Sequence, residues 1–142
     1  MSLLKKMAWL YTSFFSCEGK IFIMEKVLVI DDDRDILELV KIILTSNGIN
    51  VVISNKPETV KSLIKKNHPD ILLMDISMGT HDGRKICKDL KTNPEFSSLP
   101  IVLFSANKID PQSVNMSCAD GFLQKPFDIN SLINTIHSHM PA

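Results

Sequence analysis

The chain has 142 residues, of which 44% are apolar and 23% are charged, and this length and composition fit one globular domain with an adequate core. Its 16 basic and 16 acidic residues give a formal net charge of zero, which argues against direct binding to nucleic acid or to an acidic membrane surface. No apolar run approaches the roughly 20 residues of a membrane-spanning helix, so no membrane partner is expected.

The three cysteines, Cys17, Cys87 and Cys118, form neither a CxxC pair nor a metal-ligand spacing. An odd number of cysteines without a disulfide framework is typical of proteins in a reducing compartment. We therefore expect a cytoplasmic protein.

Residues 1–23, MSLLKKMAWLYTSFFSCEGKIFI, differ in character from the rest of the chain. Two lysines followed by an apolar stretch loosely resemble a secretory or lipoprotein signal, although polar residues interrupt that stretch. Met24 then opens MEKVLVIDDD, which is typical of the start of a domain. We interpret residues 1–23 as an N-terminal appendage (an extension or a tag) and residues 24–142 as the domain. A true signal and an additional packed segment are the alternatives.

Strands and helices are predicted to alternate after this segment. Residues 27–30 are apolar, continuous and largely β-branched, which indicates a fully buried strand. Apolar residues at helical spacing follow over residues 36–44, and Asn47-Gly48 is typical of a helix end. A second strand is predicted over residues 50–53.

A second helix is predicted to begin at Pro57, because proline suits the first helical position, and to end at His68-Pro69. Residues 71–74 are apolar and predict a third buried strand, which leads directly into Asp75. Asp82-Gly83 then opens a third helix.

Residues 100–104 predict a fourth strand, which ends at Ser105. The next segment, NKIDPQSVNMSCAD, contains a proline and few good helix formers, so only a short or irregular helix is expected there. Residues 121–124 predict a short fifth strand that ends at Lys125, and Asp128 is expected to cap a last helix.

This alternation predicts right-handed crossovers and a parallel sheet with helices on both faces. The predicted fold class is therefore α/β, a doubly wound sheet of five parallel strands. In such a sheet the carboxyl ends of all strands lie at one edge, and ligands bind there. The polar residues predicted at those ends are Asp31, Asp32, Asp33, Asp75, Ser105 and Lys125.

Carboxylates gathered at one edge raise one another's pKa values unless a cation holds them. A small site with only oxygen ligands favours Mg²⁺, which uses one or two carboxylates and accepts phosphate oxygens. Lys125 and Ser105 supply a positive charge and a hydroxyl donor for a phosphate group. A carboxylate can itself act as the nucleophile and form an aspartyl phosphate. Asp33 is expected instead to complement the helix that follows it.

Four segments, VLVIDDD, LLMDISMGTHDG, IVLFSA and LQKPF, resemble in their order and spacing the receiver domain of two-component response regulators. The resemblance covers residues 26 to about 138. It implies a CheY-like, flavodoxin-like sheet with strand order 2-1-3-4-5. It also implies a phosphorylated signalling domain rather than an enzyme, one that catalyses only its own phosphoryl transfer and dephosphorylation.

The resemblance implies that Asp75 accepts a phosphoryl group from a histidine kinase or a phosphotransfer protein. Asp32, Asp75 and the backbone carbonyl of Ser77 would ligate Mg²⁺ (or Mn²⁺), with Asp31 acting mainly through water. The pair that grips the phosphoryl group in the family corresponds to Ser105 and Lys125.

In the family an aromatic residue in the fifth strand changes rotamer as the hydroxyl residue moves, and here these residues are Phe122 and Ser105. A downstream protein, an output domain or a second copy of the chain would then read the altered face of the fourth helix, fifth strand and fifth helix. Ser77 and Asn107 occupy positions that influence how long the acyl phosphate survives.

Two other functions stay open at this point. The first is a pseudo-receiver, an interaction module that is never phosphorylated. The second is a haloacid-dehalogenase-like phosphatase, in which Asp31 would be the nucleophile and Asp33 the acid. Hydrolysis of a phosphate ester with many turnovers would distinguish such a phosphatase from a receiver.

Overall fold

The computed structural model describes residues 25–140. The interpretation of residues 1–23 as an appendage, and Cys17 with it, lies outside the described residues. The other two cysteines, Cys87 and Cys118, are free. Among the described residues, no helix has the length and the apolar character needed to cross a membrane.

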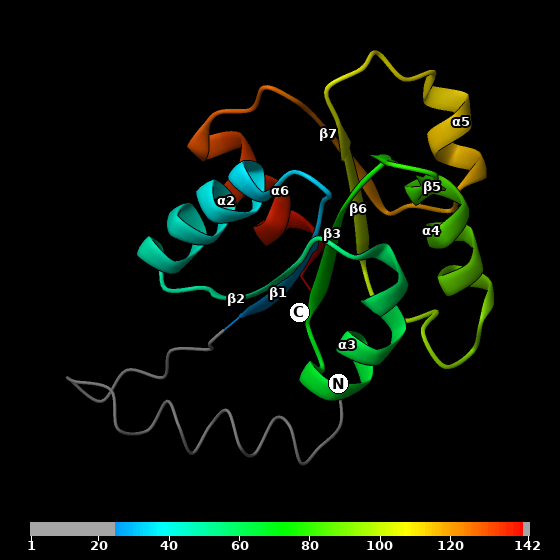
Figure 1. The fold of residues 1–142 in the computed structure, drawn as a ribbon, viewed down its shortest axis with the longest axis horizontal. Coiled ribbons are helices and arrows are strands. Elements are labelled where there is room, and N and C mark those ends of the chain that lie inside the picture. Colours follow the sequence, from blue (N-terminus) through cyan, green and yellow to red (C-terminus); the bar gives the residue numbers. More distant parts are fainter. Residues whose placement is uncertain (1–24, 141–142) are drawn as a thin grey trace.

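A parallel sheet of five strands occupies the centre of the described part of the chain (Figure 1). The strand order is β2-β1-β3-β6-β7, which is 2-1-3-4-5 when only these strands are counted, so the predicted α/β fold and strand order are confirmed. The predicted strands match the observed ones to within one residue at each end. They are β1 (Lys26–Ile30), β2 (Asn50–Ser54), β3 (Ile71–Asp75), β6 (Ile101–Ser105) and β7 (Gly121–Gln124).

Helices cover both faces of this sheet, as expected for a doubly wound fold (Figure 1). Helices α2 (Arg34–Ser46) and α6 (Ile129–His139) bury apolar side chains in the core on one face. Helices α3 (Val60–Asn67) and α4 (Gly83–Thr92) do the same on the opposite face. Because both faces are covered, β1, β3 and β6 are almost entirely buried, which explains their continuous apolar sequences.

Aspartates begin three of these helices. The side chain of Asp33 accepts hydrogen bonds from the backbone N–H groups of Asp35 and Ile36, so its expected role at the start of α2 is confirmed. Asp82 and Asp128 cap α4 and α6 in the same way. These caps fix where each helix leaves the sheet edge that carries the polar residues.

Three features differ from the predicted elements or refine them. Residues Pro57–Thr59 form a 3-10 turn ahead of α3 rather than its first α-helical turn. The loop after β3 folds into a short antiparallel hairpin of β4 (Ser77–Met78) and β5 (His81–Asp82), which was not predicted. Gly79 has φ of +60° in its turn, a backbone conformation that glycine adopts without strain. The weak segment forms the short helix α5 (Pro111–Met116).

Candidate functional site

Three aspartates meet at the carboxyl edge of the sheet. Asp31 and Asp32 follow β1, and Asp75 is the last residue of the neighbouring strand β3. One carboxylate oxygen from each of the three residues lies within 4.8 Å of the others. Asp31 and Asp75 are buried, with 0% and 6% of their surface exposed, whereas Asp32 is exposed. The predicted convergence of residues 44 positions apart is therefore a property of the fold.

Lys125 supplies the positive charge for this cluster. It follows β7, and its Nζ donates a hydrogen bond to Asp31 Oδ2 at 2.9 Å and lies 3.6 Å from Asp75 Oδ1. The same ammonium lies 4.4 Å from the centre of the Phe104 ring, so β6 supports the long side chain as it crosses the sheet edge. Only 13% of the Lys125 side chain is exposed, which places this ion pair largely out of water.

Ser105 is the last residue of β6, the strand next to β3, and Asn107 follows it two positions later. Ser105 is 1% exposed, and its hydroxyl accepts a hydrogen bond from the Asn107 backbone N–H at 3.2 Å. The Ser105 carbonyl in turn accepts from the Lys125 backbone N–H at 2.8 Å. This bond ties the loop that carries the hydroxyl to the segment that carries the ammonium.

The other two predicted residues, Ser77 and Phe122, are not part of the cluster of carboxylates. Ser77 is the first residue of β4, two positions after Asp75, and it is exposed. Its expected role as a ligand depends on its backbone carbonyl and stays a prediction. Phe122 is half-buried in β7 beside Leu103 of β6 and packs against the core under α3 and α4. Its role as a switch also stays a prediction.

The pKa values of the two buried acids, Asp31 and Asp75, differ from those of surface carboxylates. Burial, assisted by the charge of Asp31, raises the pKa of Asp75 to about 6. Burial also raises the pKa of Asp31, against the opposing effect of the hydrogen bonds from Lys125 and from the Asp33 backbone N–H. Because Asp31 has these two donors and Asp75 lies farther from the ammonium, a proton shared by the pair belongs on Asp75.

The chemistry of the donor set fits a hard divalent cation. All three side chains offer carboxylate oxygens, and their spacing lets one ion contact more than one of them. The two buried aspartates share one lysine, so part of their negative charge is not compensated at neutral pH. A bound cation would compensate it. Asp31, Asp32 and Asp75 are therefore able to hold Mg²⁺ or Mn²⁺.

The sequence profile of the response regulator receiver domain matches residues 27–137. The chain belongs to this family. Receiver domains are signalling domains that generally bind Mg²⁺ at acidic residues, and this chain has an acidic cluster in Asp31, Asp32 and Asp75. The match disfavours the phosphatase alternative, as does Asp33, whose carboxylate caps α2 instead of facing a substrate.

Curated relatives of this receiver include the protein PilG of Pseudomonas aeruginosa, with 30% identity over 119 residues, 82% of this chain and 88% of PilG. They also include the response regulator MprA of a Mycobacterium species (strain KMS), with 30% identity over 110 residues, 76% of this chain and 47% of MprA. The receiver thus spans most of PilG but only about half of MprA.

Solved structures agree with this assignment. A two-component response regulator from Clostridium difficile superposes with a TM-score of 0.73 at 25% identity, covering 81% of this chain and 94% of that one. The chemotaxis protein CheY4 of Vibrio cholerae superposes with a TM-score of 0.76 at 24% identity, covering 82% and 99%, and it supports the fold alone.

Gly83, the first residue of α4, also contributes to this site, although the sequence predicts only a helix start there. A β-carbon at this position would collide with the backbone carbonyl of Asp75, and the Gly83 N–H donates to the Ile76 carbonyl at 2.7 Å. The first turn of α4 therefore packs directly against the backbone that presents the Asp75 carboxylate. A glycine after a capping aspartate was the only signal in the sequence, and it does not reveal what the glycine touches.

We expect Gly83→Ala to lower the free energy of unfolding by about 2 kcal/mol, because the backbone of Asp75 or of α4 has to shift to admit the methyl group. Urea unfolding monitored by circular dichroism measures this loss. Lys85→Ala, an exposed change on the same helix, is the control, and it should alter stability by less than about 0.5 kcal/mol. Equal stability of Gly83→Ala and the wild type would contradict the packing seen here.

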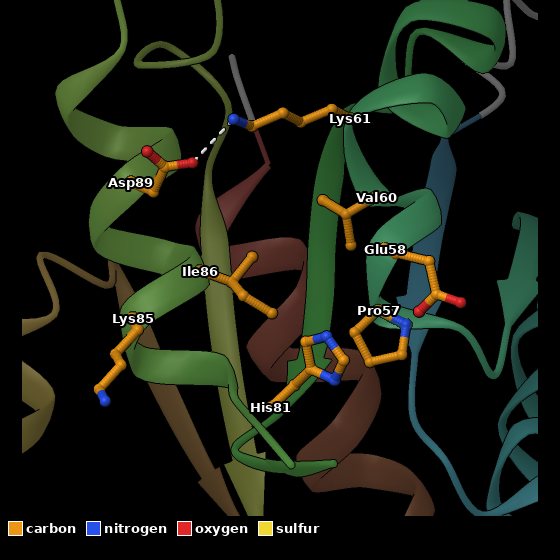
Figure 2. A pocket seen from close by; sticks show the side chains of 8 residues that line it. All are labelled: Pro57, Glu58, Val60, Lys61, His81, Lys85, Ile86 and Asp89. Carbon is orange, nitrogen blue, oxygen red and sulfur yellow. Dashed lines mark ion pairs between the residues drawn. The ribbon is translucent and has the colours of Figure 1, made fainter. Parts of the chain in front are cut away.

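A groove separate from this receiver site lies between α3 and α4 (Figure 2). It has a volume of about 320 Å³, and Pro57, Val60 and Ile86 supply its apolar surface. The ion pair between Lys61 and Asp89, 2.8 Å long, closes one end of it. None of the predicted site residues lines this groove, so it takes no part in the acidic site.

Proposed function

We propose that Asp75 of this receiver domain accepts a phosphoryl group from the phosphohistidine of a histidine kinase or phosphotransfer protein. An Asp75 carboxylate oxygen attacks phosphorus, the new P–O bond forms as the P–N bond to the donor breaks, and the electron pair leaves with the imidazole. The observation that carries the proposal is the convergence of Asp31, Asp32, Asp75 and Lys125 at one sheet edge.

The metal ligands in this proposal are Asp31, Asp32, Asp75 and the backbone carbonyl of Ser77, with Asp31 acting mainly through water. When bound, Mg²⁺ or Mn²⁺ neutralises negative charge on the phosphoryl group and on the carboxylates. Lys125 and the hydroxyl of Ser105 would bind the phosphoryl oxygens. Lys125 lies beside Asp75 and Ser105 ends the neighbouring strand, and both can donate hydrogen bonds to phosphate oxygens. Pairing of Lys125 with a phosphoryl oxygen would weaken its bond to Asp31.

Signalling would follow from the movement of Ser105 toward the phosphoryl group. Its loop would draw inward, and the half-buried Phe122 would repack into the space that the loop vacates. The face of α5, β7 and α6 would change with it and be read by an output domain, a downstream protein or a second copy of the chain. Ser77 and Asn107 flank the site, and we expect changes at either residue to alter the half-life of phosphorylated protein in a chase assay.

The cellular setting is part of the same proposal. Phosphoryl transfer from such a donor would take place in the cytoplasm, and the free Cys87 and Cys118 fit that compartment. We propose residues 24–142 as the receiver domain, with residues 1–23 as an appendage to it.

Incubation with acetyl phosphate and Mg²⁺ tests the proposed function. We expect one adduct of about 80 Da, the mass of a single transferred phosphoryl group. Peptide mapping should locate it on Asp75, and EDTA should suppress it. Absence of any adduct under conditions that label another receiver would instead favour an unphosphorylated pseudo-receiver.

The donor protein is expected to dock on α2, whose first residues adjoin the acidic site. Leu39 and Ile42 lie three positions apart on this helix and are 50% and 62% exposed. Residues at this spacing share one helix face, so the two exposed apolar side chains are neighbours on the surface of α2. Such a surface suits an apolar helix of a partner that has to bring a phosphohistidine to Asp75.

We expect Leu39→Asp with Ile42→Asp to reduce phosphoryl transfer from a donor protein at least tenfold, because two charges would have to be desolvated in the interface. Phosphorylation by acetyl phosphate, which needs no docking, should be unchanged. Met116→Asp, a change at an exposed apolar residue on α5, is the matched control for the donor reaction. Equal transfer rates in the double variant and the wild type would rule out α2 as the docking helix.

A further inference from the structure

The side-chain amide of Gln124, the last residue of β7, lies within hydrogen-bonding distance of four backbone carbonyl oxygens. Its Nε2 lies 3.1 Å from the oxygen of Ser105, 3.2 Å from that of Ala106 and 3.3 Å from that of Asn107. The carbonyl oxygen of Lys125 completes the set at 3.2 Å. The amide nitrogen rather than the amide oxygen has to face this group, because carbonyl oxygens accept hydrogen bonds and do not donate them.

The number of acceptors exceeds the number of donors. An amide group carries two N–H bonds, so it can satisfy two of these four carbonyls well at any one time. The remaining acceptors lie close enough for the amide to exchange partners through small rotations of its side chain. Gln124 therefore restrains the chain segment after β6 without fixing it in a single bonding pattern.

This restrained segment is the loop that carries the hydroxyl of the proposed site. Gln124 is the direct strand neighbour of Ser105 in the sheet, and Lys125 follows it in the chain. The Ser105 hydroxyl accepts a hydrogen bond from the Asn107 backbone N–H and keeps its own O–H to donate to the phosphoryl group toward which the proposed function moves it. Any such movement shifts the carbonyls of residues 105–107, to which Gln124 donates.

We infer that Gln124 is a positioning residue that holds the loop after β6 in its resting place and thereby sets how readily Ser105 reaches a phosphoryl group. The inference rests on the proposed phosphorylation of Asp75 and deepens it. It follows that removing the two N–H donors favours the phosphoryl-bound arrangement. The loss of one net hydrogen bond corresponds to a shift of about three- to tenfold in that equilibrium.

Two variants remove the donors without touching the acidic cluster. Gln124→Met keeps the length of the side chain, and Gln124→Leu removes the same donors with a different shape. Gln112→Met is the matched control, because Gln112 is also an exposed glutamine but lies on α5 instead of β7. The probe is beryllofluoride, a small mimic of the phosphoryl group that binds a phosphoacceptor aspartate, titrated in the presence of Mg²⁺ and monitored by nuclear magnetic resonance.

We expect both Gln124 variants to bind beryllofluoride about three- to tenfold more tightly than the wild type, while Gln112→Met binds as the wild type does. The melting temperatures of both Gln124 variants without the mimic should fall by a few degrees at most, because the resting loop loses about one net hydrogen bond. A purely structural role would lower the melting temperature without tightening the binding of the mimic.

Unchanged or weaker binding in the Gln124 variants, with a wild type that binds the mimic and is labelled by acetyl phosphate, would overturn this inference alone. A wild type that neither binds the mimic nor accepts phosphate would overturn the proposed function and this inference with it. The two failures are therefore distinguishable.

Discussion

Asp75→Asn is expected to abolish phosphorylation by acetyl phosphate and, in the same protein, to raise thermal stability at pH 7 in the presence of EDTA. The first effect follows because the amide lacks the nucleophilic oxygen that carries the phosphoryl group. The second follows from the burial of Asp75 beside Asp31, which makes the charged form of this carboxyl costly in the folded protein. A functional residue that destabilises its own fold is common at such sites.

The sign of the pH dependence follows from the pKa of Asp75, which burial raises to about 6 from its ordinary value of 3.8. Between these two pH values the folded protein holds a proton that the unfolded chain has released, so stability decreases as pH rises through this window. The loss amounts to at most about 3 kcal/mol at pH 7, and asparagine, which stays neutral, avoids it.

Thermal melts of Asp75→Asn and the wild type at pH 4, 5, 6 and 7 measure this difference directly. The melting temperatures of the two proteins should differ least at pH 4, and that of the variant should exceed that of the wild type by more as pH rises. Asp89→Asn, at an exposed aspartate on α4, should show neither the stabilisation nor the loss of phosphorylation. A difference that shrinks with rising pH would contradict the assignment of the raised pKa.

Lys125→Met is expected to lower the free energy of unfolding by about 3 kcal/mol at pH 7 and to slow phosphorylation at least a hundredfold. The stability falls because Asp31, fully buried, loses its ammonium partner and is left with the weaker hydrogen bonds around it, such as that from the Asp33 backbone N–H. The reaction slows because the charge next to Asp75 no longer stabilises the transferred group. Acid should restore part of the stability as the carboxyls become protonated.

Lys91→Met separates the two effects of the Lys125 change. Lys91 is similarly buried, with 15% of its side chain exposed, and it forms a 2.9 Å ion pair with Asp120 away from the acidic site. We expect this variant to lose stability but to be phosphorylated at the wild-type rate. Urea unfolding and acetyl phosphate labelling measure the two quantities, and a normal labelling rate in Lys125→Met would refute its role at the site.

The strands, their order and the convergence of the acids were predictable because each depends on a local pattern. A buried parallel strand reads as a continuous apolar run, and the polar residue after it has to lie at the sheet edge. Asp31, Asp75 and Lys125 are in this class. The capping roles of Asp33, Asp82 and Asp128 were equally predictable from the sequence, since capping depends on the next three residues alone.

Features that depend on contacts between distant segments were not predictable. Gly83 reads as an ordinary helix start, and only the packed structure brings it against the Asp75 carbonyl. Gln124 is a polar residue at the end of an edge strand, and its four carbonyl partners come mostly from a loop some 18 residues earlier. The hairpin of β4 and β5 pairs only two residues per strand, too few for an alternating pattern to be visible.

Asp31 and Asp75 lie at the carboxyl ends of two adjacent central strands, away from the α2 surface proposed to bind the donor. Their spacing comes from the ladder between β1 and β3, where neighbouring strands lie about 4.8 Å apart. Leu39 and Ile42, by contrast, project from the outer surface of a helix and contribute nothing to that ladder. If the donor docks on α2 as proposed, substitutions at these exposed positions would change which donor protein binds without moving the acidic cluster.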